Sequence, residues 1–459
     1  MLYEFKTRIM FFKLTAFSSC RNSYYASELS TRAQARDEGG VSISRRRLEV
    51  PRENILDDAM SKLKDLQRDS SFLEFQFENE VGTGLGPTLE YYALIGKAIK
   101  EEPSMWKETT DNSLYPNPLN FKKRSVKERK KIEKFFELVG TITARSLMDE
   151  RLIDLPISVV FWKLCFSETA ILDDVEKIDS PLYKGLQLVQ SQIDKHEKMR
   201  KRRTPTKLGE KSRKETEDSN MEIDMPKSDK YDFDCDFEQP ASKENELDIE
   251  DLCLTFTLPG TENIDLVRNG HKKTVTEHNM GEYVRSTLNC LFNDAVRVQV
   301  NAFRRGINNV FKMDALKCFL FEELEGLISG EDSHKGGVQK WNRKTLLENV
   351  VPDHGYDQES PAFLNFIEYM EKLDQEELRN FLMFITGSPR LPLGGLKSLR
   401  PKLTVVKRTC DEGLDPDDFL PSVMTCQNYV KLPEYSSFEI LKEKMMYATK
   451  EGVNSFNLS

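Results

Sequence analysis

The sequence is poor in the residues that hold metal ions. Its eight cysteines are spread over 459 residues without a C-x-x-C pair, and only five histidines are present. Structural zinc sites need cysteines or histidines in closely spaced pairs. We therefore expect no metal and no other cofactor, and the scattered cysteines are typical of a protein in a reducing compartment.

Long apolar runs and an excess of positive charge are also missing. No stretch approaches the ~20 apolar residues of a membrane span, and charge interrupts the first residues too early for a secretory signal. We therefore expect neither a membrane anchor nor a membrane partner. The formal net charge of −9 disfavours nonspecific binding to nucleic acid. The length allows two or three domains.

One long segment has little capacity to form a core. Residues 191–248 contain a basic block followed by an acidic block, with few apolar side chains in either. Such a segment buries too little apolar surface to offset the entropy lost on ordering, so we predict a disordered insertion. The basic run from Lys198 to Arg203 is either a nuclear import signal or a solvated charge run.

Helix and strand patterns occur on both sides of this insertion. Apolar residues at helical spacing predict helices from Phe135 to Ile142 and over residues 279–311 and 319–330. Asp374 and Gly387 are start and stop signals for another helix. Alternating residues predict short strands over residues 75–77 and 403–406. The chain therefore mixes helices with short strands, and no repeated strand–helix–strand units follow.

The last forty residues carry the most informative chemistry. Pro421 and polar residues lead into Cys426, and Tyr429 to Leu432 alternate as a short strand that ends at Pro433. We therefore expect Cys426 on a loop at the start of a strand, where flanking elements hold an accessible backbone in place. From these residues alone, Cys426 is either an exposed reactive thiol or a small apolar core residue.

A last helix is expected after this strand. Residues 436–439 have the spacing of a capping box, and Gly452 is the predicted end of the helix. Its buried face is predicted to carry Phe438, Leu441, Met445 and Ala448.

The C-terminal stretch resembles the catalytic loop of the HECT ubiquitin ligases. The family pattern is Leu-Pro, a few residues, Thr-Cys, and then a strand ending in Leu-Pro-x-Tyr, and residues 420–435 follow it. The resemblance runs from about Ile43 to Ser459. It is strongest to the branch that contains the yeast ubiquitin-fusion-degradation ligase and its animal and plant relatives. Met424 and Gln427 stand where many members have His and Phe, so the resemblance implies no nearby imidazole base.

The resemblance implies a ubiquitin-protein ligase. Cys426 would accept ubiquitin from a charged conjugating enzyme as a glycyl thioester and pass it to a substrate lysine, for proteasomal degradation. Phe456, fourth from the end, would position the C-terminal lobe for attack by the lysine. The carboxylates near Cys426 in sequence are candidates for deprotonating the lysine, and sequence does not choose among Asp415, Asp417, Asp418 and Glu434.

The resemblance also implies a bilobal α+β fold. Residues 46–330 would form a large, mostly helical N-lobe, 331–337 a hinge and 338–459 a small α/β C-lobe, after a partly helical or flexible extension over residues 1–45. A conjugating-enzyme-binding subdomain would cover about residues 181–328. Each residue matched to its groove is alternatively ordinary core, and these residues are Leu182, Leu186, Leu254, Tyr283 and Thr287.

Two other functions stay open. A non-catalytic module of the same fold would bind conjugating enzymes without transferring ubiquitin. A cysteine hydrolase acting on ubiquitin chains would need a histidine partner, and no histidine follows His354.

The compartments expected for this protein are the nucleus and the cytoplasm.

Overall fold

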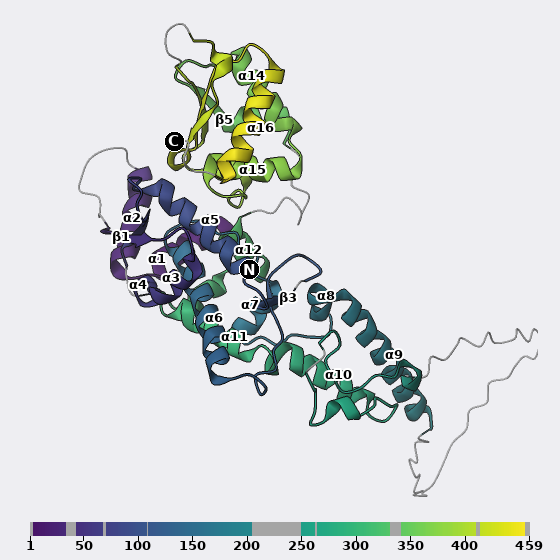
Figure 1. Cartoon of the computed structure of the whole chain (residues 1–459). Helices are drawn as coiled ribbons and strands as arrows, with labels where there is room; N and C mark the ends of the chain where they lie inside the picture. Colours follow the sequence, from purple (N-terminus) through teal and green to yellow (C-terminus); the bar gives the residue numbers. More distant parts are fainter. Residues whose placement is uncertain are drawn as a thin grey trace, which may run out of the picture. The chain divides into compact units, whose positions relative to one another are not determined.

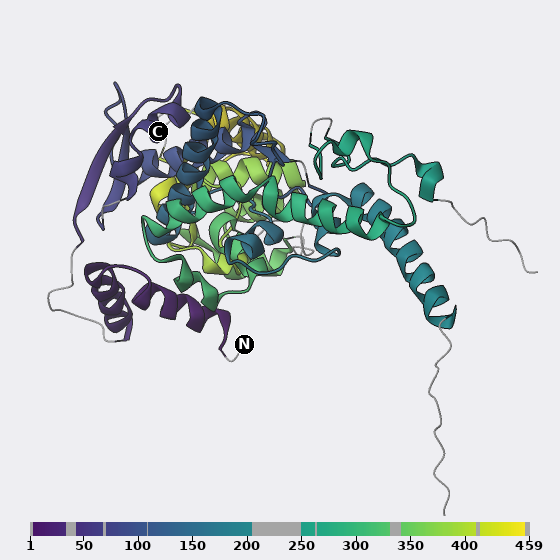
Figure 2. The same cartoon turned by 90° about the horizontal axis from the view of Figure 1, so that it is seen from below.

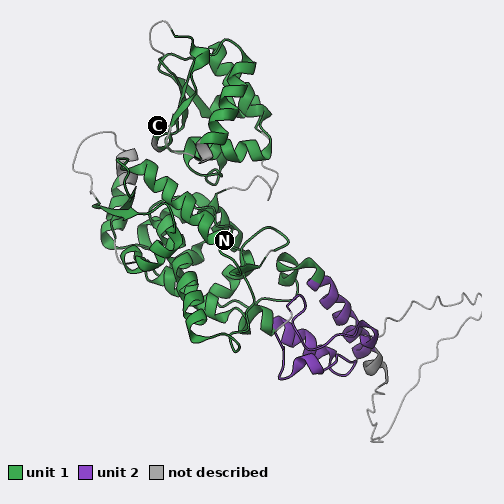
Figure 3. Cartoon of the chain, in the orientation of Figure 1, with its two compact units in different colours: residues 1–181, 289–459 green, residues 182–288 purple. Residues whose placement is uncertain are grey.

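The chain divides into two compact units (Figure 3). Unit 1 holds residues 1–181 and 289–459, and unit 2 holds residues 182–288. Among the described residues, no helix combines the length and the apolar character needed to cross a bilayer. The computed structural model describes residues 3–33, 43–67, 70–107, 109–203, 249–261, 264–330, 341–409 and 414–454.

Unit 1 outside its C-terminal part is mainly helical (Figure 1). Its four short strands form a parallel pair, β1–β2, and an antiparallel pair, β3–β4. The strands are β1 (Arg45–Val50), β2 (Phe72–Phe77), β3 (Trp106–Lys107) and β4 (Tyr115–Pro116). The helices are α1 (Phe5–Thr15), α2 (Ser19–Ala33), α3 (Ile55–Ser61), α4 (Leu63–Gln67), α5 (Leu85–Glu101), α6 (Val126–Met148), α7 (Val159–Cys165), α8 (Asp174–Ile178), α11 (Arg297–Asn308) and α12 (Phe321–Ser329).

The helix α6 begins at a capping box. The hydroxyl of Ser125 accepts the backbone N–H of Glu128 at 3.2 Å, and the Glu128 carboxylate accepts the N–H of Ser125 at 2.8 Å. The apolar stripe predicted from Phe135 to Ile142 is buried. The predicted core helix is therefore confirmed, although it continues to Met148.

The helices α6 and α11 cross at unusually short range because each has a glycine at the contact. A Cβ atom on Gly140 would lie 2.1 Å from the carbonyl oxygen of Phe303, and one on Gly306 would lie 2.1 Å from that of Glu137. Any larger residue at either glycine would force the backbones apart. Buried side chains of both helices surround this crossing.

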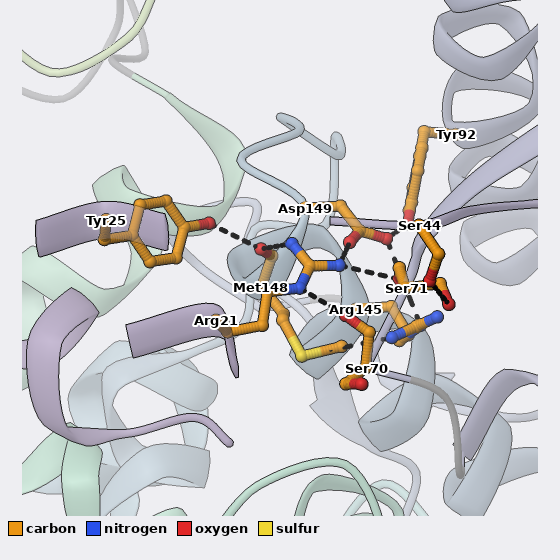
Figure 4. A network of polar contacts seen from close by, with 9 residues as sticks. All are labelled: Arg21, Tyr25, Ser44, Ser70, Ser71, Tyr92, Arg145, Met148 and Asp149. Atoms are coloured by element: carbon orange, nitrogen blue, oxygen red, sulfur yellow. Dashed lines mark hydrogen bonds and ion pairs between the residues drawn. The ribbon is translucent and has the colours of Figure 1, made fainter. Parts of the chain in front are cut away.

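A buried polar network holds the N-terminal helix α2 against the rest of unit 1 (Figure 4). The fully buried guanidinium of Arg21 donates to the backbone carbonyls of Ser70, Ser71 and Met148 at 2.6, 2.7 and 2.9 Å. Its Nη2 also pairs with the Asp149 carboxylate at 2.6 Å. A buried charge is tolerated when it is paired and hydrogen-bonded, and each of the three guanidinium nitrogens has at least one partner here.

The helix α1 adds an apolar contact and a second ion pair. Its Phe12 ring packs edge-on against Phe311 and Phe319, with ring centroids 5.5 and 5.6 Å apart. Arg8 pairs with Glu323 at 2.5 Å. The two N-terminal helices lie side by side (Figure 2). The segment assigned to an extension over residues 1–45 therefore contributes two packed helices, and residues 34–42 lie outside the described ranges.

Unit 2 is built mainly from two helices that begin or end at its borders. These are α9 (Ser180–Arg203) and α10 (Met280–Asn289), accompanied by two 3-10 turns at Ile249–Leu252 and Gly270–Lys272. The rings of Phe256 and Tyr283 meet edge-on at 5.6 Å inside the unit. After α10 a π-helical turn, Cys290–Asp294, leads into α11, so the helix predicted over residues 279–311 is present but interrupted.

The start predicted for the disordered insertion is wrong. The helix α9 continues to Arg203, so residues 191–203 are helical. Their charged and polar side chains are mostly strong helix formers, and a prediction from low hydrophobicity alone ignores that propensity. The rest of the predicted insertion, residues 204–248, lies outside the described residues.

The C-terminal part of unit 1, residues 341–454, combines a four-stranded sheet with four helices (Figure 1). The strand order is β5-β6-β8-β7, with β7 antiparallel to β8 and the other pairs parallel. The strands are β5 (Val350–Asp353), β6 (Leu403–Lys407), β7 (Ser422–Met424) and β8 (Tyr429–Leu432). The helices are α13 (Arg343–Asn349), α14 (Pro361–Lys372), α15 (Gln375–Thr386) and α16 (Phe438–Asn454). Strands and helices share one hydrophobic core.

Several local signals in this part act as predicted, and two do not. Asp374 caps α15 and Gly387 ends it with φ 73°, as expected. The capping box predicted over residues 436–439 is wrong: the N-cap is Ser437, whose hydroxyl accepts the N–H of Ile440, and isoleucine cannot complete a box. The predicted stop at Gly452 is wrong, because α16 continues to Asn454. The buried face predicted for this helix is confirmed for Leu441, Met445 and Ala448, and Phe438 packs against the same core.

Candidate functional site

A four-residue turn at the edge of the C-terminal sheet carries the candidate cysteine. The strands β7 and β8 pair antiparallel with Met424 opposite Tyr429. Between them a 3-10 turn, Thr425–Gln427, is followed by Asn428 in left-handed conformation. The backbone of Cys426 therefore lies at the tip of a hairpin, which confirms the predicted loop at the start of a strand. The side chain of Cys426 lies outside what the structure describes.

The neighbours of Cys426 that depart from the common family pattern are exposed. Met424 is 43% exposed, and Gln427 is exposed as well. The one histidine of the described C-terminal part, His354, accepts the N–H of Lys407 at the far end of β6. The Cys426 turn is bonded instead to the beginning of β6, through Thr404. The one described histidine of this sheet thus lies at the opposite end of β6 from the Cys426 turn.

The other described cysteines are two buried thiols, two exposed thiols and Cys318, which is half-buried. Burial raises the pKa of Cys290 to about 11 and raises that of Cys165 still further. Both remain protonated near neutral pH, and a protonated thiol is a poor nucleophile. Cys20 and Cys253 are exposed. Exposure alone therefore does not single out a reactive cysteine, and the hairpin position of Cys426 is the distinguishing feature.

Side chains from neighbouring elements fix the segment that leads into the hairpin. The hydroxyl of Tyr435, just after β8, donates to the carbonyl of Phe419 at 2.8 Å. Arg408 donates to the carbonyl of Leu420, and its guanidinium lies 5.2 Å from the centre of the Phe419 ring. These contacts hold the chain on the entry side of β7.

Asp417, one of the four candidate carboxylates, already accepts two hydrogen bonds from Ser436. It accepts the backbone N–H and the hydroxyl of Ser436 at 2.8 and 2.5 Å. These hydrogen bonds hold the pKa of Asp417 below its ordinary value, and the bond from the hydroxyl has the larger effect. A carboxylate of lowered pKa is a weaker base, so Asp417 is a poor choice for taking a proton from lysine.

The remaining three carboxylates differ in their partners. Asp415 accepts the N–H of Asp417 at the start of a 3-10 turn. Glu434 pairs with Lys407 at 2.5 Å. Asp418 is exposed, and its carboxylate makes no hydrogen bond or ion pair with any residue that the structure describes. Of the four, Asp418 is therefore the carboxylate that a lysine can approach without displacing a protein partner.

The five residues predicted to line a conjugating-enzyme groove all lie in unit 2, but most are covered. Leu186, Tyr283 and Thr287 are fully buried, and Leu182 is nearly so. Leu254 is half-buried and is the most accessible of the five. An exposed apolar side chain that the sequence did not single out is Leu188 on α9, 38% exposed. The groove stays a prediction.

The second predicted catalytic residue, Phe456, lies outside the described residues together with the rest of 455–459. The chain is described as far as Asn454, the last residue of α16. The role predicted for Phe456 therefore stays a prediction.

Comparison with known proteins identifies the family. Residues 92–459 match the model of the HECT-domain (ubiquitin-transferase) family. The chain belongs to the HECT family. Both the predicted family and the predicted α+β fold are confirmed. The match begins within α5, so the N-terminal helices and the β1–β2 pair belong to unit 1 without being part of the matched region.

Three curated relatives align with the whole chain. E3 ubiquitin-protein ligase TRIP12 of Danio rerio is 35% identical, and the match covers 100% of this chain and 22% of that protein. E3 ubiquitin-protein ligase UPL4 of Arabidopsis thaliana is 34% identical, with 100% and 29% covered. Ubiquitin fusion degradation protein 4 of Saccharomyces cerevisiae is 31% identical, with 100% and 29% covered. The chain spans less than a third of the length of each.

Proposed function

We propose that this HECT chain is a ubiquitin-protein ligase that carries ubiquitin as a thioester on Cys426. The observation that supports this most directly is the backbone of Cys426 at the tip of the β7–β8 hairpin, in a chain that belongs to the HECT family. Its partners are then a ubiquitin-charged conjugating enzyme, ubiquitin and a protein substrate. The match to a ubiquitin fusion degradation protein supports proteasomal degradation as the fate of the substrate.

The first step is an exchange between two thiols. The Cys426 thiolate attacks the carbonyl carbon of the ubiquitin C-terminal glycine, the new C–S bond forms, and the conjugating enzyme's cysteine leaves as a thiolate. The exchange is nearly balanced in energy and requires no metal. A free thiol titrates near ~8.5, and even a small thiolate fraction is strongly nucleophilic. The main contribution of the protein is therefore to place the sulfur.

The second step transfers ubiquitin to an amine. A neutral lysine amine attacks the thioester carbonyl, an amide bond forms, and the Cys426 thiolate leaves. The amine must give up protons before and during the attack. Asp418 is the candidate acceptor, because Asp415, Asp417 and Glu434 already accept hydrogen bonds or pair with other residues. Replacing Asp418 with Asn should slow transfer to lysine more than it slows thioester formation.

The test of the proposed function is a non-reducing gel. The chain is incubated with activating enzyme, conjugating enzyme, ATP and ubiquitin, and we expect an adduct that disappears on adding a thiol. Cys426→Ala should fold normally and form no such adduct. Cys20→Ala, which removes another exposed cysteine, is the matched control and should behave as the wild type. A reducible adduct that persists in Cys426→Ala would rule the proposal out.

The same gel separates the other two functions. A binding module without catalysis gives no adduct but still associates with the conjugating enzyme. A hydrolase instead shortens preformed ubiquitin chains. The second function has less support, because the one histidine in the described part of the C-terminal sheet lies at the end of β6 away from the Cys426 turn.

We also propose that unit 2 receives the conjugating enzyme and that the protein acts in the nucleus and the cytoplasm. Leu254 and Leu188 are the accessible apolar side chains that support the first proposal. The basic run from Lys198 to Arg203 at the end of α9 supports nuclear import. Imaging of the tagged chain with and without substitution of this run tests the compartment.

A further inference from the structure

Asn428 closes the turn that carries Cys426 and ties it to the neighbouring strand. Its side chain is only 7% exposed, and the amide Nδ2 donates a hydrogen bond of 2.7 Å to the carbonyl of Pro401. Its backbone carbonyl accepts the N–H of Thr404 at 3.0 Å. Thr404 lies in β6, and Pro401 lies two residues before this strand begins. Asn428 therefore connects the Cys426 turn to β6 through its backbone and to the segment just before β6 through its side chain.

Asparagine suits this position for two reasons. Its backbone lies at φ 51° and ψ 42°, the left-handed region that glycine, asparagine and aspartate tolerate best. Its side chain also supplies the buried N–H donor that the Pro401 carbonyl accepts. Glycine meets only the first demand. An ionised aspartate meets the first but has no donor, and it would place an oxygen against the carbonyl oxygen.

Residues of α15 also lie beside the turn, but the hydrogen bond that closes the turn is weak. The backbone hydrogen bond that closes it, from the N–H of Asn428 to the carbonyl of Thr425, is 3.4 Å long. This exceeds the usual range of about 2.7–3.2 Å, so the bond is weak. The strand β7 is short and lies at the sheet edge. The buried side chain of Asn428 therefore adds a specific hydrogen-bonded restraint on the Cys426 backbone to the packing against α15 and the pairing of β7 with β8.

We propose that Asn428 is a positioning residue for ubiquitin transfer, which holds the Cys426 turn at a fixed place against the Pro401 carbonyl. The inference rests on the proposed role of Cys426 as the acceptor. Transfer between thiols depends mainly on the approach of the two sulfur-bearing loops, and a small misplacement of one loop slows it strongly. Asn428 acts through the turn and leaves the intrinsic reactivity of the sulfur unchanged.

The test compares two variants at this position in the full chain. Asn428→Gly keeps the left-handed backbone and removes the amide, whereas Asn428→Ala removes the amide and adds backbone strain. Single-turnover mixing with a conjugating enzyme charged with labelled ubiquitin gives the rate of thioester formation. Chase with free lysine gives the rate of discharge. Circular dichroism measures the folded fraction, and alkylation of Cys426 by iodoacetamide, mapped by mass spectrometry, measures the reactivity of the sulfur.

A matched control is available in another turn. Asn112 also has a left-handed backbone, at φ 56°, and it is exposed in the N-terminal part of unit 1. Asn112→Gly therefore makes the same chemical change at a position without a buried amide. We expect it to transfer ubiquitin at the wild-type rate.

We expect Asn428→Gly to slow thioester formation by about tenfold to a hundredfold. The folded fraction and the alkylation rate of Cys426 should match those of the wild type, and Asn428→Ala should be at least as slow. Wild-type transfer in Asn428→Gly would overturn the inference. The inference would also be overturned if the transfer rate fell only in proportion to the unfolded fraction, or if the alkylation rate of Cys426 fell as much as the transfer rate. Equal slowing of transfer in Asn112→Gly would overturn it as well. The proposed function fails separately, if the wild-type chain forms no adduct or Cys426→Ala still forms one.

Discussion

Removing the guanidinium of Arg21 should strongly destabilise the N-terminal part of unit 1. In Arg21→Ala, Asp149 loses an ion-pair partner at 2.6 Å while its own side chain stays 2% exposed. The carbonyls of Ser70, Ser71 and Met148 lose their donor at the same time. Breaking a buried ion pair from one side costs about 3–5 kcal/mol. Total stability is about 5–15 kcal/mol for a typical domain, so this loss is a large share.

An exposed ion pair next to this network provides the matched control. Lys13 on α1 pairs with Glu150 at 2.6 Å, but the two side chains are 29% and 40% exposed. Exposed pairs contribute about 0–1 kcal/mol, because water screens the charges and both side chains lose freedom. Lys13→Ala should therefore cost less than about 1 kcal/mol by the same reasoning.

Two measurements together test this prediction. Urea unfolding gives the change in free energy of unfolding for both variants. Hydrogen–deuterium exchange of peptides from α2 and β2 shows whether the loss is local to the network, since exchange reports local opening. We expect much faster exchange there in Arg21→Ala than in Lys13→Ala. Equal effects of the two substitutions would refute the reasoning from burial.

Three further predictions concern packing, pH and the C-terminal tail. Gly140→Ala should lower the free energy of unfolding by about 1–3 kcal/mol, because the added methyl group overpacks against α11. Gly185→Ala, which has open space around its Cβ, should raise the free energy of unfolding by about 0.5–1 kcal/mol. Urea unfolding of both variants measures the two changes, and changes of the same sign would contradict the prediction. The depressed pKa of Asp417 means that its contact with Ser436 stabilises the fold above the ordinary pKa of ~3.9 and is lost as the pH falls through the lower folded-state pKa. Ser436→Ala should therefore lower the unfolding midpoint at neutral pH and converge with the wild type in acid, and a constant difference would contradict this. Phe456→Ala should leave thioester formation intact and slow discharge to lysine in single-turnover assays, whereas equal loss of both steps would count against its predicted role.

The parts of the fold that local signals specify were predictable from sequence. The cap at Asp374 and the left-handed stop at Gly387 depend on residues within one turn of the helix end. The alternation that buries Val430 and Leu432 defines β8 in the same way. The backbone position of Cys426 follows from these short-range patterns, since it lies between a proline-bounded segment and this strand.

The contacts between distant residues were not predictable in this way. Arg21 and Asp149 lie far apart in the chain, and no local periodicity connects a buried arginine with its acid. The Asn428 amide finds its acceptor in the carbonyl of Pro401, 27 residues earlier in the chain and just before β6. The hydrogen bond that distinguishes Asp417 from the other three candidate carboxylates comes from Ser436, which the sequence does not place beside it.

The central claim is that Cys426 carries ubiquitin, and a serine at this position tests it most directly. Cys426→Ser should trap ubiquitin from the charged conjugating enzyme as an oxygen ester, which resists thiols and is cleaved by mild base. Mass spectrometry should locate the ubiquitin C-terminal glycine on residue 426. A thiol-sensitive adduct in this variant, or ubiquitin trapped on another residue, would contradict the account.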